Sequence, residues 1–174
     1  MPESDDKIED ALNRKFREVK KEWNAAKDSQ DAYNREEMYS PRLDFAVGPF
    51  NIVGRTTQEK RMEIERTVAE FAPFIQNLKT RSVFPNSSLR PNSNPRCFLA
   101  IEIENTTSRK HRLGGIFNAS MLGAYGIILA PDKDELDALR RLMNYVDYLE
   151  DVGKMGKAWR NAIIMTKKSF LEAS

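Results

Sequence analysis

Two apolar runs with a polar, helix-like segment between them occupy residues 96–130. The first run, residues 96–104, is followed by threonine and serine side chains that can cap a helix reaching about Leu122. Gly123 ends that helix, and the compact apolar run AYGIILA, residues 124–130, follows as a second strand. A strand, a helix and a strand with short connections predict a right-handed parallel crossover. The chain is therefore expected to fold as an α/β protein.

The N-terminal segment carries a helical pattern. Ser4 can cap a helix that runs to about Lys27. Apolar residues recur at helical spacing along it, namely Ile8, Leu12, Phe16, Val19 and Trp23. A second short helix is expected in the polar residues that follow, so that the predicted helical segment covers about residues 1–38.

The rest of the chain divides into short elements. Pro41 precedes an alternating strand at 42–47, and Gly48–Pro49 predicts a turn with a short returning strand. Thr56 and Glu59 form a capping box for a helix that Pro73 should divide. The C-terminal third predicts a helix at 132–151, then either a strand at 161–166 with a closing helix or one continuous helix. With 174 residues and no repeat, we expect one domain, residues 1–174, with a mixed central sheet flanked by helices.

Composition excludes several kinds of chemistry. Cys97 is the only cysteine and His111 the only histidine, so an internal disulfide, a cysteine-rich zinc site and a histidine-based triad are disfavoured. The sequence has no GxxxxGK(S/T) loop. The single cysteine indicates an intracellular, cytoplasmic protein. The acidic N-terminus is unlike a secretory signal, and the longest apolar stretch is too short to span a membrane, so no membrane partner is expected. The net charge of +2 permits a nucleic-acid partner without requiring one.

Carboxylates lie within the predicted strands. Glu102 and Glu104 share one face of their strand, about 6.5 to 7 Å apart, because side chains alternate along a strand. If that face is covered, two unpaired carboxylates would cost several kcal/mol. Mg²⁺ would compensate them, and Asp44 on a separate strand could complete the site. Alternatively, the strand lies at an edge, and the acids face water or pair with basic side chains.

The order of these elements resembles the PD-(D/E)xK nuclease superfamily, which includes the restriction endonucleases. The likeness consists of Pro41 and Asp44 in PRLD, Glu102 and Glu104 in IEIEN, and the helix and strand from 109 to 130. It covers about residues 36–130. The resemblance implies a restriction endonuclease-like three-layer core.

The same resemblance implies a set of site residues. Asp44 and Glu102 would bind Mg²⁺ or Mn²⁺, together with the backbone carbonyl of Ile103. Glu104 stands where the family usually has a lysine, so this is an ExE variant, and Glu104 could orient water or accept its proton. Lys110 would then supply the missing positive charge to the phosphate. Glu36 or Glu37 could add a water-mediated contact, although an exposed position is the simpler interpretation.

The start of the helix at 109 is basic. Arg109, Lys110 and Arg112 suit a DNA backbone, because helix N-termini favour anions. They could equally form a solvated turn. His111 is expected at the surface or in packing, and Gly114 and Gly115 are expected where the helix packs closely on the sheet.

These inferences predict a Mg²⁺-dependent DNA endonuclease that hydrolyses phosphodiester bonds, with a homodimer as a natural form for cutting both strands. The alternative is a catalytically inactive nuclease-fold protein that binds nucleic acid or protein. A structural or regulatory interaction protein and a phosphoesterase for small substrates are weaker alternatives. The position of Asp44 relative to the glutamate pair distinguishes the structural alternative from the others.

Overall fold

The computed structural model describes residues 4–28, 40–52, 58–84, 89–106, 108–156 and 160–174. Its strands are β1 (Val19–Asn24), β2 (Arg42–Val47), β3 (Cys97–Ile103), β4 (Gly123–Ala130) and β5 (Ala162–Thr166). Its helices are α1 (Asp5–Lys15), α2 (Ala25–Asp28), α4 (Gln58–Glu70), α5 (Ala72–Arg81), α6 (Arg109–Leu122), α7 (Lys133–Asp151) and α8 (Lys167–Ala173). None of these described helices is long and apolar enough to cross a membrane.

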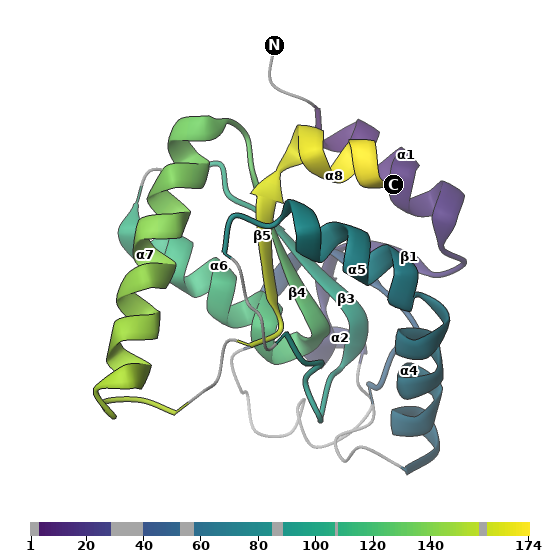
Figure 1. Ribbon diagram of the computed structural model, residues 1–174. Helices are drawn as coiled ribbons and strands as arrows, with labels where there is room; N and C mark the ends of the chain where they lie inside the picture. The colour runs from purple at the N-terminus through teal and green to yellow at the C-terminus, as the bar shows by residue number, and fades with distance from the viewer. Residues whose placement is uncertain (1–3, 29–39, 53–57, 85–88, 107, 157–159) are drawn as a thin grey trace.

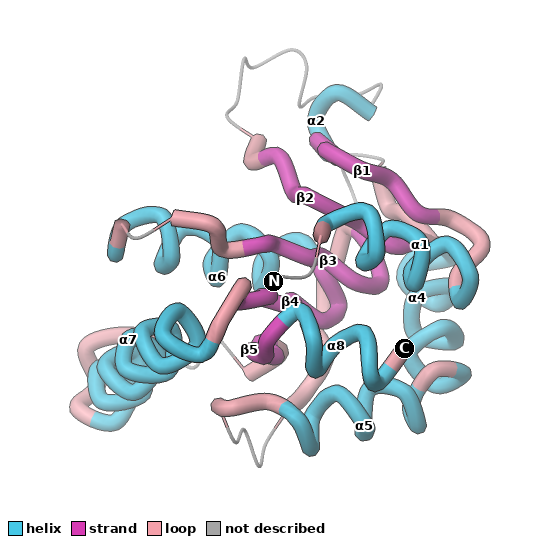
Figure 2. Tube along the Cα trace, turned by 90° about the horizontal axis from the view of Figure 1, so that it is seen from above, coloured by secondary structure: helices cyan, strands magenta, loops and turns pink. Residues whose placement is uncertain are grey.

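The five strands form one mixed sheet in the order β1-β2-β3-β4-β5 (Figure 2). Strand β2 is antiparallel to both β1 and β3, whereas β3, β4 and β5 are mutually parallel. The β3-α6-β4 and β4-α7-β5 units are the parallel crossovers that require a helix between strands. The predicted α/β class and the crossover at 96–130 are confirmed.

Helices cover both faces of the sheet (Figure 1). On one face, α1, α4, α5 and α8 pack against side chains such as Phe45, Leu99 and Ile127. On the other face, α6 and α7 cover a layer that includes Ala100 and Ile128. All eight residues of β4 are buried, which fits its apolar sequence and its position within the sheet.

The closest approach of helix and sheet occurs at Gly126, whereas only one of the two expected glycines, Gly115, lies in contact range of β3 side chains. A Cβ atom on Gly126 would lie 2.7 Å from the backbone of Ala119 and Ser120, so α6 can contact β4 only because that position is glycine. By contrast, a Cβ atom on Gly114 would meet nothing within 4 Å. Close packing is therefore not the reason for glycine at Gly114.

The prediction of a long N-terminal helix is wrong beyond Lys15, where α1 ends. Residues Val19–Asn24 form strand β1, which pairs with β2 along the sheet edge. Val19 and Trp23 fit a helical spacing, but the ladder to β2 outweighs this local pattern. Glu22 takes a positive φ of 51°, which marks a local distortion of β1 opposite Asp44. The short helix expected at about 28–40 lies largely outside the described residues.

The other predicted elements are confirmed only in part. Pro73 divides the 58–81 region into α4 and α5, as predicted, while the cap residue Thr56 lies outside the described residues. The described residues 49–52 form no returning strand. The C-terminus is a strand followed by a helix, not one continuous helix, and the Thr166 hydroxyl caps α8 by accepting the Ser169 N–H at 3.1 Å.

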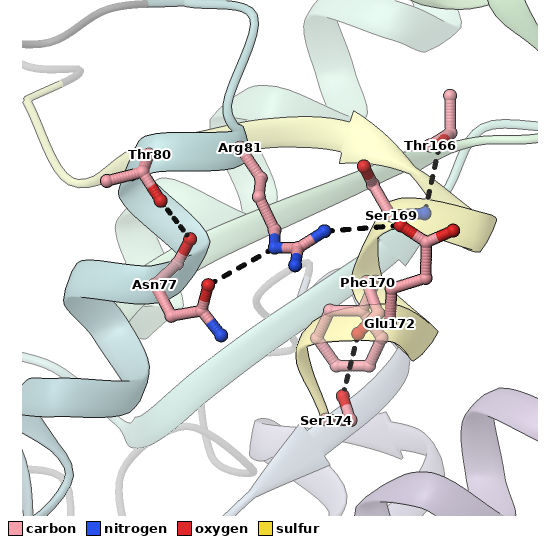
Figure 3. Close-up of polar contacts among 8 residues, drawn as sticks. All are labelled: Asn77, Thr80, Arg81, Thr166, Ser169, Phe170, Glu172 and Ser174. Carbon is pink, nitrogen blue, oxygen red and sulfur yellow. Dashed lines mark hydrogen bonds and ion pairs between the residues drawn. The ribbon is translucent and has the colours of Figure 1, made fainter.

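Helices α5 and α8 are joined by polar contacts (Figure 3). The Arg81 guanidinium contacts the Glu172 carboxylate at 3.2 Å and the Asn77 side chain at 3.2 Å. Beside them, the edge strand β5 is covered by the segment after α5, because the Val83 N–H donates to the Ile164 carbonyl at 2.9 Å. This edge of the sheet is therefore closed by the chain itself.

Candidate functional site

The candidate acids gather at one end of the sheet. Parallel strands β3, β4 and β5 all end at this edge, and α6, α7 and α8 begin there. Strand β2 runs the opposite way, so its first half reaches the same edge. Asp44, Glu102 and Glu104 are thus brought to one edge of the sheet from two neighbouring strands. A site shared by the three acids requires that the strands carrying them be neighbours, and they are.

Asp44 lies where β2 and β3 separate. The register of the two strands ends at the pair Phe45–Ile101. Just beyond it, Asp44 Oδ2 accepts the backbone N–H of Ile103 at 2.6 Å. A carboxylate therefore occupies the place of the next ladder bond, and its short, charge-assisted contact fixes the position of the side chain.

Glu102 lies beside Asp44, and the two acids are electrostatically coupled. In addition to burial, the side chain of Asp44 raises the pKa of the Glu102 carboxyl group, whereas the backbone of Asp44 lowers it. A hydrogen bond between two carboxyl groups would require a proton on one of them.

The electrostatics of the pair show that two anions are disfavoured here. Burial, followed by the negative charge of Asp44, raises the pKa of Glu102 from 4.5 to about 8. Burial also raises the pKa of Asp44, while the Ile103 N–H opposes that change. Near neutral pH the pair therefore favours retaining one proton over carrying two negative charges.

Glu104 lies at the end of β3 and is only 7% exposed. Its Oε1 atom accepts two hydrogen bonds from Thr106, one from the backbone N–H at 3.1 Å and one from the hydroxyl at 2.7 Å. A Cβ atom on Gly115 would lie 3.6 Å from Glu104 Oε2 and 3.8 Å from Glu102 Cβ. Both glutamates therefore lie beneath the bare backbone of α6.

The basic residues of α6 separate into two groups. Arg109, Lys110 and the neighbouring His111 are exposed, and Lys110 makes no ion pair with a described residue. Arg112 instead forms a bidentate pair with Glu135 of α7, including an Nη2–Oε2 contact of 2.6 Å. The Arg112 side chain is 13% exposed and is engaged in joining two helices. The structure thus leaves Arg109 and Lys110 as surface cations near this edge.

A buried lysine at the same edge was missed by the sequence analysis. Lys167, the first residue of α8, is 4% exposed. Its Nζ atom contacts Asp5 Oδ1 at 2.7 Å and Asn105 Oδ1 at 3.4 Å. The two partners lie 162 and 62 residues away along the chain. The only sequence feature that could have identified Lys167 is its position directly after an apolar strand, at the carboxyl edge of the sheet where helices begin.

The donor set fits a hard divalent cation. Among the described residues, no group of three or more His, Cys, Asp or Glu side chains has a metal-site arrangement, and Glu36 and Glu37 lie outside the described residues. Asp44 and Glu102 supply two carboxylates, and the Ile103 backbone lies beside them, with its N–H donated to Asp44. Mg²⁺ needs only one or two carboxylates because water and substrate oxygens fill the other positions.

These contacts define what a bound cation would do here. A cation between Asp44 and Glu102 would displace a proton from the pair and relieve the repulsion that raises the pKa of Glu102. Glu104 lies two residues on, with one carboxylate oxygen held by Thr106. Such a cation would lie beside a further carboxylate and near two surface cations.

No relative was found by comparison with known proteins: no protein-family model, no curated protein and no solved structure matches the chain. Function must therefore be inferred from the fold and from the chemistry of this site.

Proposed function

We propose that the protein is a Mg²⁺-dependent DNA endonuclease that hydrolyses phosphodiester bonds, with a restriction endonuclease-like core. The observation that carries the proposal is the coupled Asp44–Glu102 pair, in which the Ile103 N–H fixes the Asp44 carboxylate where β2 and β3 separate. A buried pair that retains a proton to about pH 8 is unfavourable as two anions, and a divalent cation compensates it directly.

The order of elements supports the nuclease interpretation. The acid-bearing strand β2 precedes the ExE strand β3, and a helix and an apolar parallel strand follow. This is the order on which the resemblance to PD-(D/E)xK nucleases rests. The proposed ligands are the side chains of Asp44 and Glu102 and the carbonyl of Ile103.

Each residue near the metal position has a separate task. Mg²⁺ bound there would act as a Lewis acid toward the phosphate and lower the pKa of a bound water. Glu104 would orient the attacking water or accept its proton. Lys110 and Arg109 would contact the nucleic-acid backbone from the start of α6, where the helix dipole also favours a phosphate. Arg112 contributes through its pair with Glu135, which holds α6 against α7.

Glu104 also supports a second candidate function. It stands where the resembling family usually has a lysine, and Lys110 is exposed without a contact to the acids among the described residues. A nuclease fold that has lost catalysis would bind nucleic acid or protein and retain the acid pair as a structural remnant. In that case DNA binding requires no metal ion.

Cleavage of supercoiled plasmid in Mg²⁺ or Mn²⁺ tests the proposal, with EDTA as the metal-free condition. We expect nicking by the wild-type protein and its loss in Glu102→Ala and Asp44→Asn. Asp147→Asn is the matched control, because it removes an exposed carboxylate of α7 far along the chain from the site.

The same assay separates the two candidates. If wild-type protein cleaves none of supercoiled, linear, single-stranded or branched DNA, the endonuclease proposal is wrong. Metal-independent DNA binding that survives Asp44→Asn would then favour the inactive binding protein.

A further inference from the structure

Helix α7 has a second apolar stripe on the side away from the sheet. Its inner face buries Leu139, Met143 and Val146. Tyr145 and Tyr148 are nevertheless 57% and 58% exposed, and Val152, directly after the helix, is 47% exposed. Figure 1 shows α7 at the outside of the molecule, with one flank turned away from the strands.

The stripe continues in the N-terminal direction through Arg141. The positions 141, 145, 148 and 152 are separated by four, three and four residues, which places them along one line of the helix surface. Such a line is the seam through which one helix packs on another. A surface helix that needs only to cover the sheet would carry polar residues here.

The charges beside the stripe are arranged with opposite signs at its two ends. Arg141 is exposed before Tyr145, and Asp151 is exposed after Tyr148. Arg141 and Asp151 make no ion pair with a described residue. If α7 packed against a second α7 in the antiparallel direction, Arg141 of each copy would approach Asp151 of the other. Parallel packing would instead place like charges together.

The overall charge of α7 disfavours a nucleic acid as the partner. The helix carries six acidic and three basic side chains. A polyanion carries no positive group to offset this net charge, whereas a second copy of the helix supplies its own Arg141 to Asp151. Self-complementary patches are the defining feature of two-fold symmetric dimers.

We propose that the outer stripe of α7, formed by Arg141, Tyr145, Tyr148 and Val152, is a dimer interface with a second copy of this chain. The two helices pack antiparallel about a two-fold axis between Tyr145 and Tyr148. Each Tyr145 packs against Tyr148 of the other copy, and both hydroxyls remain at the wet rim. The interface is small, so the dimer is weak and depends on concentration.

Sedimentation velocity of the full chain, from low micromolar to near-millimolar concentration, tests the proposal. We expect a monomer–dimer equilibrium that Tyr145→Glu/Tyr148→Glu weakens by at least about tenfold, because buried aromatic contacts dominate small interfaces. Met62→Glu is the matched control, since Met62 is 40% exposed on α4 and lies outside the stripe. A monomer at every concentration, or equal weakening by Met62→Glu, would overturn the proposal.

Charge exchange tests the pairing itself. Arg141→Glu should weaken the dimer because it places two acids together, and adding Asp151→Arg should restore it. Failure of the second change to restore the dimer contradicts the proposed pairing. The protein could instead be monomeric and bind a single-stranded oligonucleotide. If Tyr145→Glu/Tyr148→Glu abolishes that binding, the stripe binds nucleic acid and the dimer proposal is wrong.

Cysteine cross-linking determines the direction of the helices. With 1.5 Å of rise per residue, antiparallel packing separates the two copies of position 145 by about 4 to 5 Å along the axis and those of position 152 by about 16 Å. Tyr145→Cys should therefore form an intermolecular disulfide, whereas Val152→Cys should not. Equal cross-linking at both positions would indicate parallel packing and contradict the proposal. The single native cysteine, Cys97, is buried and does not interfere.

Discussion

The two ends of the sheet satisfy buried polar groups in opposite ways. At the end where β4 and β5 begin, Asn161 donates from Nδ2 to the carbonyls of Ser120, Gly123 and Ala124, at 2.8 to 3.3 Å. At the other end, Asp44 accepts the Ile103 N–H at 2.6 Å, and burial together with the charge of Asp44 raises the pKa of Glu102. A neutral amide completes one end, and carboxyl groups with no basic partner among the described contacts occupy the other.

This difference supports the proposal that the amide end is structural and that the carboxylate end is the functional one. An amide that donates to backbone carbonyls leaves no charge behind, so it stabilises the fold without needing a ligand. A buried pair of acids leaves a deficit of positive charge that a proton satisfies only below about pH 8. Glu135 lies at the same end of the sheet but, unlike Asp44 and Glu102, is neutralised by a basic side chain, that of Arg112.

The largest effect on stability is expected from breaking that compensated pair. Arg112→Met leaves Glu135 charged and nearly buried, and should lower the free energy of unfolding by about 3 kcal/mol in urea denaturation. The matched pair Arg61–Glu65 is exposed on α4, so Arg61→Met should change it by less than about 0.5 kcal/mol. Equal effects would show that Glu135 is not held in a buried environment.

The next effect concerns pH. The folded protein binds the Glu102 proton more tightly than the unfolded chain does, because the pKa is about 8 instead of 4.5. The free energy of unfolding should therefore fall as pH rises from about 4.5 to 8 and level off above, with a total loss on the order of a few kcal/mol. Glu102→Gln should flatten this decline. Unfolding curves across that pH range measure it, and an equally steep decline in Glu102→Gln would assign it to another group.

A smaller effect is expected at the amide end. Asn161→Ala removes the two Nδ2 hydrogens that serve three backbone carbonyls, from a residue that is 4% exposed, and should lower stability by about 1 to 3 kcal/mol. Its response to Mg²⁺ should match that of the wild-type protein. Asn144→Ala, on the exposed side of α7, serves as the control. A loss of the Mg²⁺ response in Asn161→Ala would contradict the division between the two ends.

The smallest effect is expected from alanine substitutions at two adjacent glycines of α6. Gly114→Ala should stabilise the helix by about 1 kcal/mol without altering metal binding, because its Cβ atom meets nothing within 4 Å. Gly115→Ala adds a methyl group 3.6 Å from Glu104 Oε2, and should weaken metal binding even where it stabilises the helix. Identical metal binding by the two variants would show that the acids do not bind their cation beneath α6.

The sequence was most informative where local pattern and tertiary structure agree. The apolar run of β4, ended by Pro131, and the start of α6 after β3 were predicted closely because their burial demands the same residues that their local propensity favours. Strand β1 was missed because Phe16, Val19 and Trp23 also fit a helix, and only pairing with β2 decides between the two. Local spacing cannot report that pairing.

The meeting of the acids at one edge of the sheet was predictable in part for the same reason. Asp44 and Glu102 could be named because acids are conspicuous within apolar strands, and their meeting followed from the neighbouring position of those strands. The contacts of Lys167 with Asp5 and Asn105 could not be foreseen, since they join segments from both ends of the chain to the middle. The engagement of Arg112 by Glu135 likewise depends on how α6 packs against α7.

The central claim is that a divalent cation binds Asp44 and Glu102 and displaces a proton from the pair. Isothermal titration of Mg²⁺ or Mn²⁺ in buffers of different ionisation enthalpy measures the protons released on binding. We predict release approaching one proton per metal ion at pH 7, a decrease above about pH 8, and loss of both binding and release in Glu102→Gln. Metal binding without proton release, or undiminished binding by Glu102→Gln, would contradict the account.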